Sequence, residues 1–542
     1  MSATRDEPGD RDDRARPAAV CPGCLPGRVP AGRWPADYDR PPAPGQQLAV
    51  AETVARLLEA PGPRTVNGPP GVGQVTLLRE LAAAIVVARA ERLAELPSPA
   101  AAFDPPARDR DRRQPGRARP AVTPLNQALA GLEIVVAAAD NGAAENITAE
   151  ITGPESIGAQ WREAAAEVGY FSATARLVHG EGAWAMVAVR LGGAAERQAF
   201  AGQFCLEAPG RADGCPGDLP GRPAGPPVSW DAAREEFLAA GEKASVLAAE
   251  RAEVAVARAR LTDLRRDAAT AYAAITATED TLRTLAGQRV AAERSLRAAW
   301  HRCQAAARAL DAHARAKPGL RASRPAWLGG GREWRAGQGE LGAALRDCEA
   351  TVSTAQRAVA EARAGFAAAV QARAEPAAAL RRLTAECAAA QEVIARADPR
   401  ADQELAHART GLFLAALALH KALICAQASR VRENLDALAD FLSGNGGPGD
   451  PALLAAWQTF FLVVPVVCTT FASVPALFGG LERESVGWLV IDETGQAPSR
   501  QVTGAIGRAK RTVTVGEGPP SPPGVAGRDG GVAGQHPNRS WA

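Results

Sequence analysis

The residues most suggestive of chemistry are the glycines that begin at Gly68. They belong to the stretch Val66-Asn67-Gly68-Pro69-Pro70-Gly71-Val72-Gly73-Gln74-Val75-Thr76, which has the spacing of a phosphate-binding loop, G-x-x-x-x-G-K-[ST]. In such a loop the backbone N–H groups hold phosphates, the Lys reaches the β- and γ-phosphates, and the hydroxyl binds Mg²⁺. Here Gln74 stands in the Lys position and Val75 in the Ser/Thr position. The backbone scaffold for a nucleotide is retained, whereas the side chains that neutralise a triphosphate are replaced.

A second segment, near the end of the chain, supplies carboxylates. It runs Gly487-Trp488-Leu489-Val490-Ile491-Asp492-Glu493-Thr494-Gly495-Gln496. A hydrophobic strand that ends in Asp-Glu is a Walker B pattern, in which Asp492 would hold Mg²⁺ and Glu493 would polarise the attacking water. The two motifs together predict ATP and Mg²⁺ as cofactors, each bound weakly or not at all because Gln74 and Val75 lack the required groups.

The elements around these motifs predict an α/β fold with a parallel sheet. We expect a strand at 64–67, the loop, and then a helix at 77–93, which is the context that a phosphate-binding loop requires. A helical pattern precedes them from Gln46 to Leu58, and an apolar helix is expected at 412–423. Further strands are expected at 132–137, 461–464, 487–492 and 512–515, and alternation mixed with helix continues to about 204, including 184–189.

A heptad pattern separates the two motifs. Apolar residues recur every seven positions in two series, with Arg289 and Arg373 interrupting them: Leu247, Val254, Leu261, Ala268, Ile275, Leu282 and Leu296, then Leu345, Val352, Val359, Phe366, Leu380, Cys387 and Ile394. A Gly/Pro/Trp-rich break at 317–334 lies between the series. Two heptad arms joined by one turn predict a long antiparallel coiled-coil hairpin, with Pro376 kinking the returning arm or marking a local break. Two long helices in an ordinary bundle are the alternative.

Composition narrows the class of protein only loosely. The 542 residues are 46% hydrophobic, which suffices for a sizeable core, and a net charge of +2 gives no global attraction to nucleic acid. Cys21 and Cys24 form a single C-x-x-C pair, a weak zinc signal without a second pair, so we favour free thiols in a reducing compartment. Because apolar runs stay short and the first 16 residues are charged, we expect a soluble, cytoplasmic chain that does not enter a membrane.

The order of these motifs resembles the first RecA-like domain of superfamily 1 nucleic-acid helicases, of the branch that includes the RNA-surveillance enzymes. It is especially similar to large bacterial AAA/DEAD-box-type relatives with a coiled-coil insertion, over roughly residues 44–516. The resemblance implies an ATP-binding, nucleic-acid-dependent ATPase or translocase. It implies nucleotide contacts by Gln47, which matches the adenine-reading glutamine, and by Gly68, Pro69, Pro70, Gly71, Gly73, Gln74, Val75 and Thr76.

The same resemblance implies further roles. DNA or RNA would be contacted by Asn141, Asn146, Thr148, Thr470 and Ser473. Asp492 would be the metal ligand and Glu493 the catalytic residue, while Gln496 would couple the nucleotide state to motion.

Departures from the family pattern predict a loss of activity. Besides Gln74 and Val75, the sequence Gly516-Glu517-Gly518-Pro519-Pro520 stands where the family has Gly-Asp-Pro-x-Gln, and no second RecA domain follows. The abrupt change at Glu517 suggests a frameshift or a truncation. We therefore expect a hydrolysis-deficient chain, so that whether it is an enzyme stays open at this point.

Two other classes of function compete with the helicase resemblance. One is a coiled-coil ATPase of the SMC kind, which also places a hairpin between its Walker motifs; the lack of a hinge domain or a C-x-x-C hook at 318–334 counts against it. The other is a non-catalytic interaction protein. In that case Trp327 and Trp334, with the four arginines near them (Arg321, Arg324, Arg332 and Arg335), would contact nucleic acid or a protein partner. A Trp-capped hairpin turn is the alternative for this tip.

The expected organisation follows from these patterns. We predict a disordered segment at 1–40, a first RecA-like part at 41–205 with a linker-like stretch at 97–124, and a Pro/Gly linker at 206–230. The hairpin would span 231–398, the second RecA-like part 399–516, and a disordered tail 517–542.

Overall fold

The computed structural model describes residues 29–37, 42, 44–66, 74–104, 122–204, 229–317, 324–396, 401–443, 451–492 and 499–515. The chain divides into two compact units, one of Met1–Ala255 with Asp398–Ala542 and one of Val256–Ala397. Cys21, Cys24, most of 206–230 and all of 517–542 lie outside the described ranges, so the expectations for them stay predictions.

A parallel sheet forms the centre of the first unit. Its six strands are β1 (Pro63–Val66), β2 (Ile134–Ala138), β3 (Ala188–Arg190), β4 (Val466–Thr470), β5 (Val486–Asp492) and β6 (Ala509–Val515). They lie in the order β1-β6-β5-β2-β4-β3, and every neighbouring pair is parallel. Parallel strands covered on both faces carry continuous apolar runs. All residues of β2 and β4 are accordingly buried. The expected mixture of helices and a parallel sheet is confirmed.

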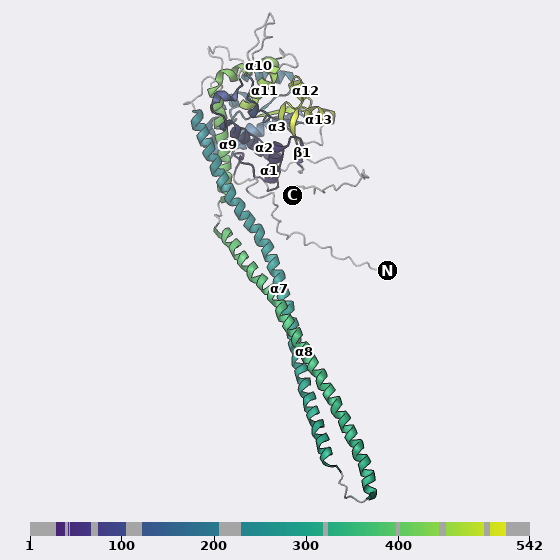
Figure 1. The fold of residues 1–542 in the computed structure, drawn as a ribbon. Helices are drawn as coiled ribbons and strands as arrows, with labels where there is room; N and C mark the ends of the chain where they lie inside the picture. Colours follow the sequence, from purple (N-terminus) through teal and green to yellow (C-terminus); the bar gives the residue numbers. More distant parts are fainter. Residues whose placement is uncertain are drawn as a thin grey trace, which may run out of the picture. The chain divides into compact units, whose positions relative to one another are not determined.

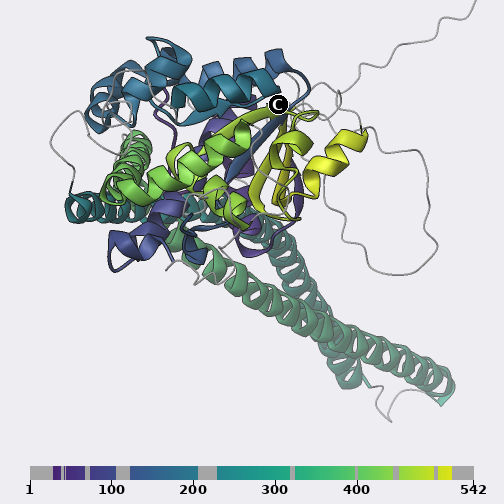
Figure 2. The same ribbon diagram turned by 90° about the horizontal axis from the view of Figure 1, so that it is seen from above.

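Helices pack around this sheet (Figures 1 and 2). The longest helix of the core is α9, which packs against α2, while α1 packs on α2 and α3 packs on β3 and β4. The helices are α1 (Pro44–Glu59), α2 (Gln74–Ala94), α3 (Asn141–Thr152), α4 (Arg162–Val168), α5 (Ser172–His179), α6 (Ala194–Phe204), α9 (Ala401–Ala426), α10 (Ala428–Leu442), α11 (Pro451–Val463), α12 (Val474–Phe478) and α13 (Ser499–Ile506). Short 3₁₀ turns are η4 (Pro99–Ala102), η5 (Gln127–Leu129), η6 (Pro154–Ser156) and η7 (Ala159–Trp161).

Two predicted elements differ from the structure. The strand expected at 461–464 is instead the end of helix α11, and the strand begins later, at Val466. An apolar run of this length does not distinguish a buried helix from a buried strand, and Pro465 then ends the helix. The stretch at 97–124 is also partly ordered, because Phe103 pairs with Leu125 and the Thr123 N–H donates to Asn434 Oδ1 at 2.8 Å.

Residues 29–37 are ordered, although disorder is expected from their composition. Trp34 is only 2% exposed, and its indole N–H donates to the Ser156 carbonyl at 2.9 Å. Gly32 lies so close to α2 that an added Cβ would come within 2.6 Å of Val87 Cγ2. One buried aromatic residue and one close backbone approach therefore fix this segment against the core. The expectation of disorder over 1–40 is wrong for 29–37.

One described helix is long and apolar enough to be considered as a membrane span. It is the part of α9 from Asp402 to Ala426, and 78% of its apolar window is buried inside the protein. This helix lies in the core against α2. A mostly buried core helix meets the same criteria as a membrane helix, so α9 is weak evidence for a membrane.

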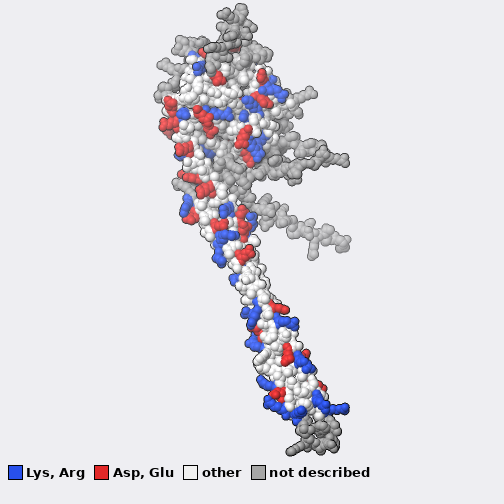
Figure 3. Space-filling view, in the orientation of Figure 1, with Lys and Arg blue, Asp and Glu red and all other residues white. Residues whose placement is uncertain are grey.

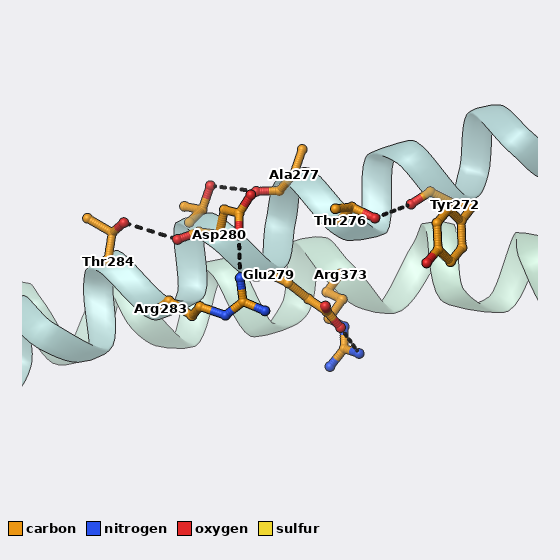
Figure 4. A network of polar contacts seen from close by, with 9 residues as sticks. Tyr272, Thr276, Ala277, Glu279, Asp280, Arg283, Thr284 and Arg373 are labelled. Atoms are coloured by element: carbon orange, nitrogen blue, oxygen red, sulfur yellow. Dashed lines mark hydrogen bonds and ion pairs between the residues drawn. The ribbon is translucent and has the colours of Figure 1, made fainter.

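The second unit contains parts of two long helices, α7 (Trp230–Arg315) and α8 (Arg324–Arg396). Three ion pairs join them: Arg260–Glu386 at 2.9 Å, Glu279–Arg373 at 2.6 Å and Glu293–Arg363 at 3.1 Å. As the residue number rises along α7 it falls along α8, so the helices are antiparallel. Figure 4 shows the pair Glu279–Arg373 reaching from one helix to the other.

Burial along the pair follows the predicted heptads. On α7 the less exposed positions alternate at spacings of three and four: Leu261, Leu264, Ala268, Ala271, Ile275, Thr278, Leu282 and Leu285. This is the pattern of a seam that faces a partner helix. Arg289 continues the seam instead of breaking it, because its guanidinium lies over the Phe366 ring, 4.9 Å from the centroid.

The returning helix begins earlier than expected, and it is continuous at the predicted proline. Helix α8 continues through Pro376 from Arg324 to Arg396, so the proline does not end the arm. Helix α8 also begins at Arg324, which places Trp334 inside the helix and not in the break predicted at 317–334. Alanine and charged residues flank the glycines at 329–331. These residue types favour helix, and α8 includes the glycines.

Candidate functional site

The carboxyl ends of three strands bring the two predicted motifs to one edge of the sheet. In the register, Val66 of β1 lies opposite Val515 of β6, and Val515 lies opposite Asp492 of β5. Neighbouring strands are about 4.8 Å apart, so Val66 and Asp492 lie roughly 10 Å apart. The last residue of the strand that leads into the phosphate-loop glycines and the Walker B carboxylate are thus aligned across the sheet. Ligands of open parallel sheets bind at this edge.

A small cavity lies at this edge. Its lining contains Gln74 and Val75 from the start of α2 and Asp492 from the end of β5, with apolar residues completing it: Leu78, Val136, Ile147, Val490 and Val515. Its free volume is about 10 Å³, comparable to the space that one water molecule needs. The amide nitrogen Nε2 of Gln74 is buried there and has no hydrogen-bond partner in the part of the chain that the structure describes.

Helix α2 adds a favourable field for an anion. Gln74 is its first residue, and the helix continues for 21 residues to Ala94. The N-terminus of a helix carries about half a positive charge and free N–H groups. The loop residues Gly68, Pro69, Pro70, Gly71 and Gly73 lie outside the described residues, as do Glu493 and Gln496. Their predicted roles are therefore untested by the geometry.

The arginines that flank the loop in sequence are already engaged. Arg64 on β1 forms an ion pair with Glu52 at 2.8 Å. Arg79 on α2 donates to the backbone carbonyl of Glu150 and lies 3.8 Å from its carboxylate. Burial lowers the pKa of Arg79, with Glu150 opposing the shift. Neither cation is free to replace the missing lysine.

The side-chain amide of Gln47 is hydrogen-bonded to a nearby backbone carbonyl and is not available to a ligand as it stands. It lies on α1, and its Nε2 donates to the Pro42 carbonyl at 2.8 Å. An adenine-reading role would require this amide to leave Pro42, so the predicted nucleotide contact of Gln47 needs a rearrangement.

The residues predicted to contact nucleic acid on α3 separate into two groups. Asp140 caps the helix by accepting from the Ala143 N–H at 2.8 Å, and Asn141 and Asn146 are exposed. Thr148 is only 4% exposed, and its hydroxyl donates to the Ala144 carbonyl at 2.8 Å. Thr148 therefore does not fit the predicted role, because its polar group is turned into the helix.

The end of β4 carries the other predicted contacts. The Thr470 hydroxyl donates to Ser473 Oγ at 3.0 Å, and the Ser473 N–H lies 3.2 Å from Thr470 Oγ1. These bonds turn the chain into α12. Thr470 is 7% exposed and Ser473 is half-buried, so Ser473 is the more accessible of the two.

Cys468 is a neighbour of the site that sequence reasoning missed. It is fully buried on β4, beside β2, which separates it from β5. Burial raises the pKa of its thiol to about 12, with its hydrogen bond to the Thr148 side chain opposing the shift and the charge of Asp492 adding to it. A thiol with so high a pKa stays protonated and is not a nucleophile at neutral pH. Only its position in the register, and no sequence motif, links it to Asp492.

The donor set at the edge fits Mg²⁺ poorly. Asp492 supplies one carboxylate, while Val75 offers a methyl group where a hydroxyl is needed. Within the described ranges, no group of three or more His, Cys, Asp or Glu side chains could hold a metal ion. The arrangement can attract an anion through a helix N-terminus, but the described motif residues Gln74 and Val75 do not supply the ammonium and hydroxyl groups that bind a metal–triphosphate complex.

Together, the described residues define a mostly helical protein built on a six-stranded parallel sheet, with Gln74, Val75 and Asp492 at the carboxyl ends of β1, β6 and β5. Comparisons with protein-family models, with curated proteins and with solved structures give no match. The assignment of a function therefore depends on the residues of this edge.

Proposed function

We propose that the first unit is a RecA-like nucleotide-binding domain related to superfamily 1 helicases, which binds ATP weakly and does not hydrolyse it. The observation that carries the proposal is the alignment of Val66, Val515 and Asp492 across three parallel strands. The positions of β1, which ends at Val66, and of α2, which starts at Gln74, on either side of the predicted loop support it further.

Weak binding follows from the charges at the edge. The N-terminus of α2 attracts phosphate. Asp492 repels it, and the lysine that would offset this repulsion is replaced by Gln74. We therefore expect a dissociation constant on the order of 0.1–1 mM for ATP, a free energy of about −4 to −5.5 kcal/mol.

The absence of hydrolysis follows from the size of the missing effects. Cationic clamps on a transferring phosphoryl group are usually the largest catalytic term, and one arginine finger is worth about 10³–10⁵ in rate. A site without the lysine and the Mg²⁺ hydroxyl has lost one cation and a ligand that helps to hold a second one, Mg²⁺. In this proposal the chain is a cytoplasmic binding protein that still contacts DNA or RNA, through the exposed Asn141 and Asn146 and the half-buried Ser473.

Titration of a fluorescent ATP analogue into the full chain, with and without Mg²⁺, tests this proposal. We expect weak, saturable binding that ATP competes away and that Mg²⁺ changes by less than about threefold, because the donor set is incomplete. The variant Asp492→Asn should bind several-fold more tightly, since it removes a negative charge that repels phosphate.

Asp440→Asn is the matched control, because Asp440 is exposed on α10 and is not at the edge. It should leave the affinity unchanged. No saturable binding, or an equal effect of the two variants, would contradict the proposal. Phosphate release that single-stranded DNA stimulates would contradict the claim that hydrolysis is lost.

A further inference from the structure

Positive charge is concentrated at one end of the α7–α8 pair. We call the residues 294–317 and 331–335 the basic end; they contain eight Lys or Arg residues and two Asp or Glu residues. The remaining parts of the pair are balanced, with nine basic and eleven acidic residues at 231–293 and seven of each at 336–396. Blue side chains gather at this end of the pair in Figure 3. Because the whole chain carries only +2, this charge is a local feature.

Few carboxylates neutralise this charge. All three ion pairs between α7 and α8 lie outside the basic end, at Arg260–Glu386, Glu279–Arg373 and Glu293–Arg363. Inside it, Arg315 pairs with Asp311. Six arginines there have no ion-pair partner among the residues that the structure describes: Arg294, Arg297, Arg302, Arg308, Arg332 and Arg335.

Contacts between the helices hold this end in one arrangement. The rings of His313 and Trp334 stack with centroids 5.6 Å apart and planes 6° apart. The Trp334 indole N–H donates to the His313 carbonyl at 2.9 Å, and a His313 ring nitrogen lies 3.0 Å from the Trp334 carbonyl. Trp334 is thus used to close the helix pair, which fits the predicted Trp-capped turn. The side chain of Trp327 lies outside the described residues.

A different tryptophan is available to a ligand. Trp300 on α7 is 53% exposed, and Arg297 lies one helical turn before it on the same face. An exposed aromatic ring beside uncompensated arginines is the combination with which proteins bind single strands, because bases stack on the ring while the cations contact phosphates. A protein partner with an acidic surface would bind the arginines, but the Trp300 ring would add less to its affinity.

We propose that the basic end binds single-stranded nucleic acid through its arginines and Trp300. This site lies in the second unit and does not depend on nucleotide binding at the sheet edge. It is also separate from Asn141, Asn146 and Ser473. The hairpin would thereby supply a contact with nucleic acid that the small net charge of the whole chain does not indicate.

Fluorescence anisotropy of a labelled oligothymidylate with the full chain tests the proposal. The triple variant Arg297→Glu/Arg302→Glu/Arg308→Glu should bind at least tenfold more weakly. The slope of log K against log salt should become shallower by about two, because each phosphate contact on a single strand contributes roughly 0.7. Trp300→Ala should weaken binding about fivefold or more, with little change in the slope.

The matched control is Arg357→Glu/Arg381→Glu/Arg382→Glu. It makes the same change in charge at three exposed arginines of α8 outside the basic end, and it should lose less than about threefold. Helical circular dichroism should be the same for all variants. Absence of binding by the unaltered chain, equal losses in the two triple variants, or no effect of Trp300→Ala would each overturn the proposal. ATP-analogue binding should persist in the basic-end variants, so that failure here is distinguishable from failure at the sheet edge.

Discussion

Replacing Glu80 with glutamine is expected to lower the free energy of unfolding by about 3–5 kcal/mol. Glu80 is 4% exposed on α2, and its carboxylate lies 4.0 Å from the guanidinium of Arg409, itself 7% exposed. Burial raises the pKa of Glu80, and burial lowers the pKa of Arg409 to about 10, while attraction between the two opposes both shifts. For the pKa of each group, the effect of burial is thus larger than the effect of the attraction between them. The pair adds little stability by itself, but removing one member leaves an uncompensated buried charge.

The loss should spread to residues 29–37. Arg409 donates to the carbonyls of Pro30 and Gly32, and Arg33 is also buried near Glu80. Without the carboxylate, these two cations repel each other beneath the segment that Trp34 anchors. Urea unfolding, followed by tryptophan fluorescence, measures the effect. Glu91→Gln, an exposed change on the same helix, should cost less than about 0.5 kcal/mol. If both variants unfold at the same urea concentration, the buried cluster does not stabilise the fold.

Restoring lysine and threonine at 74 and 75 should tighten ATP binding by about 150-fold or more when Mg²⁺ is present. Hydrogen bonds to charged groups contribute about 1.5–3 kcal/mol each, and the two restored groups act on one ligand. Gln74 begins α2 and Val75 lines the same cavity as Asp492, so the new side chains would start from the edge where phosphate is expected. Affinity should also become dependent on Mg²⁺, because a hydroxyl now joins the carboxylate of Asp492.

Hydrolysis should not return with binding. Arg64 and Arg79, the arginines nearest the loop in sequence, are held by Glu52 and Glu150. Titration of the double variant and a phosphate-release assay measure the two properties separately. Gln391→Lys adds the same charge at an exposed position on α8 and should not change the affinity. Equal affinities of the double variant and the unaltered chain would mean that phosphate does not reach residues 74 and 75.

Much of the architecture could be predicted because the apolar residues follow the patterns of helices and strands. The heptads predicted α7 and α8, and the β-branched runs predicted β2, β5 and β6 to within a few residues. The run at 461–464 could not be assigned in this way, because an apolar stretch shows no period. The order of residues 29–37 could not be predicted either. It depends on contacts of Trp34 and Glu80, which are distant in sequence and come together only in the folded core.

The candidate site was predictable in part. The sequence motifs indicated Gln74, Val75 and Asp492, and these three residues line one cavity. The engagement of Gln47 by Pro42 and the inward turn of Thr148 are consequences of local hydrogen bonds that no motif encodes. Cys468 was missed for a related reason, since only strand order brings it near Asp492.

Photo-crosslinking tests the central claim, that ATP binds at the edge formed by β1, β6 and β5. The full chain is labelled with an ATP derivative that carries a photoreactive group on the γ-phosphate, digested with trypsin and analysed by mass spectrometry. We predict label in the peptides 65–79 and 484–500, which contain the loop and Asp492, and loss of that label when unmodified ATP is added. Label confined to other peptides, or label that ATP does not displace, would contradict the account.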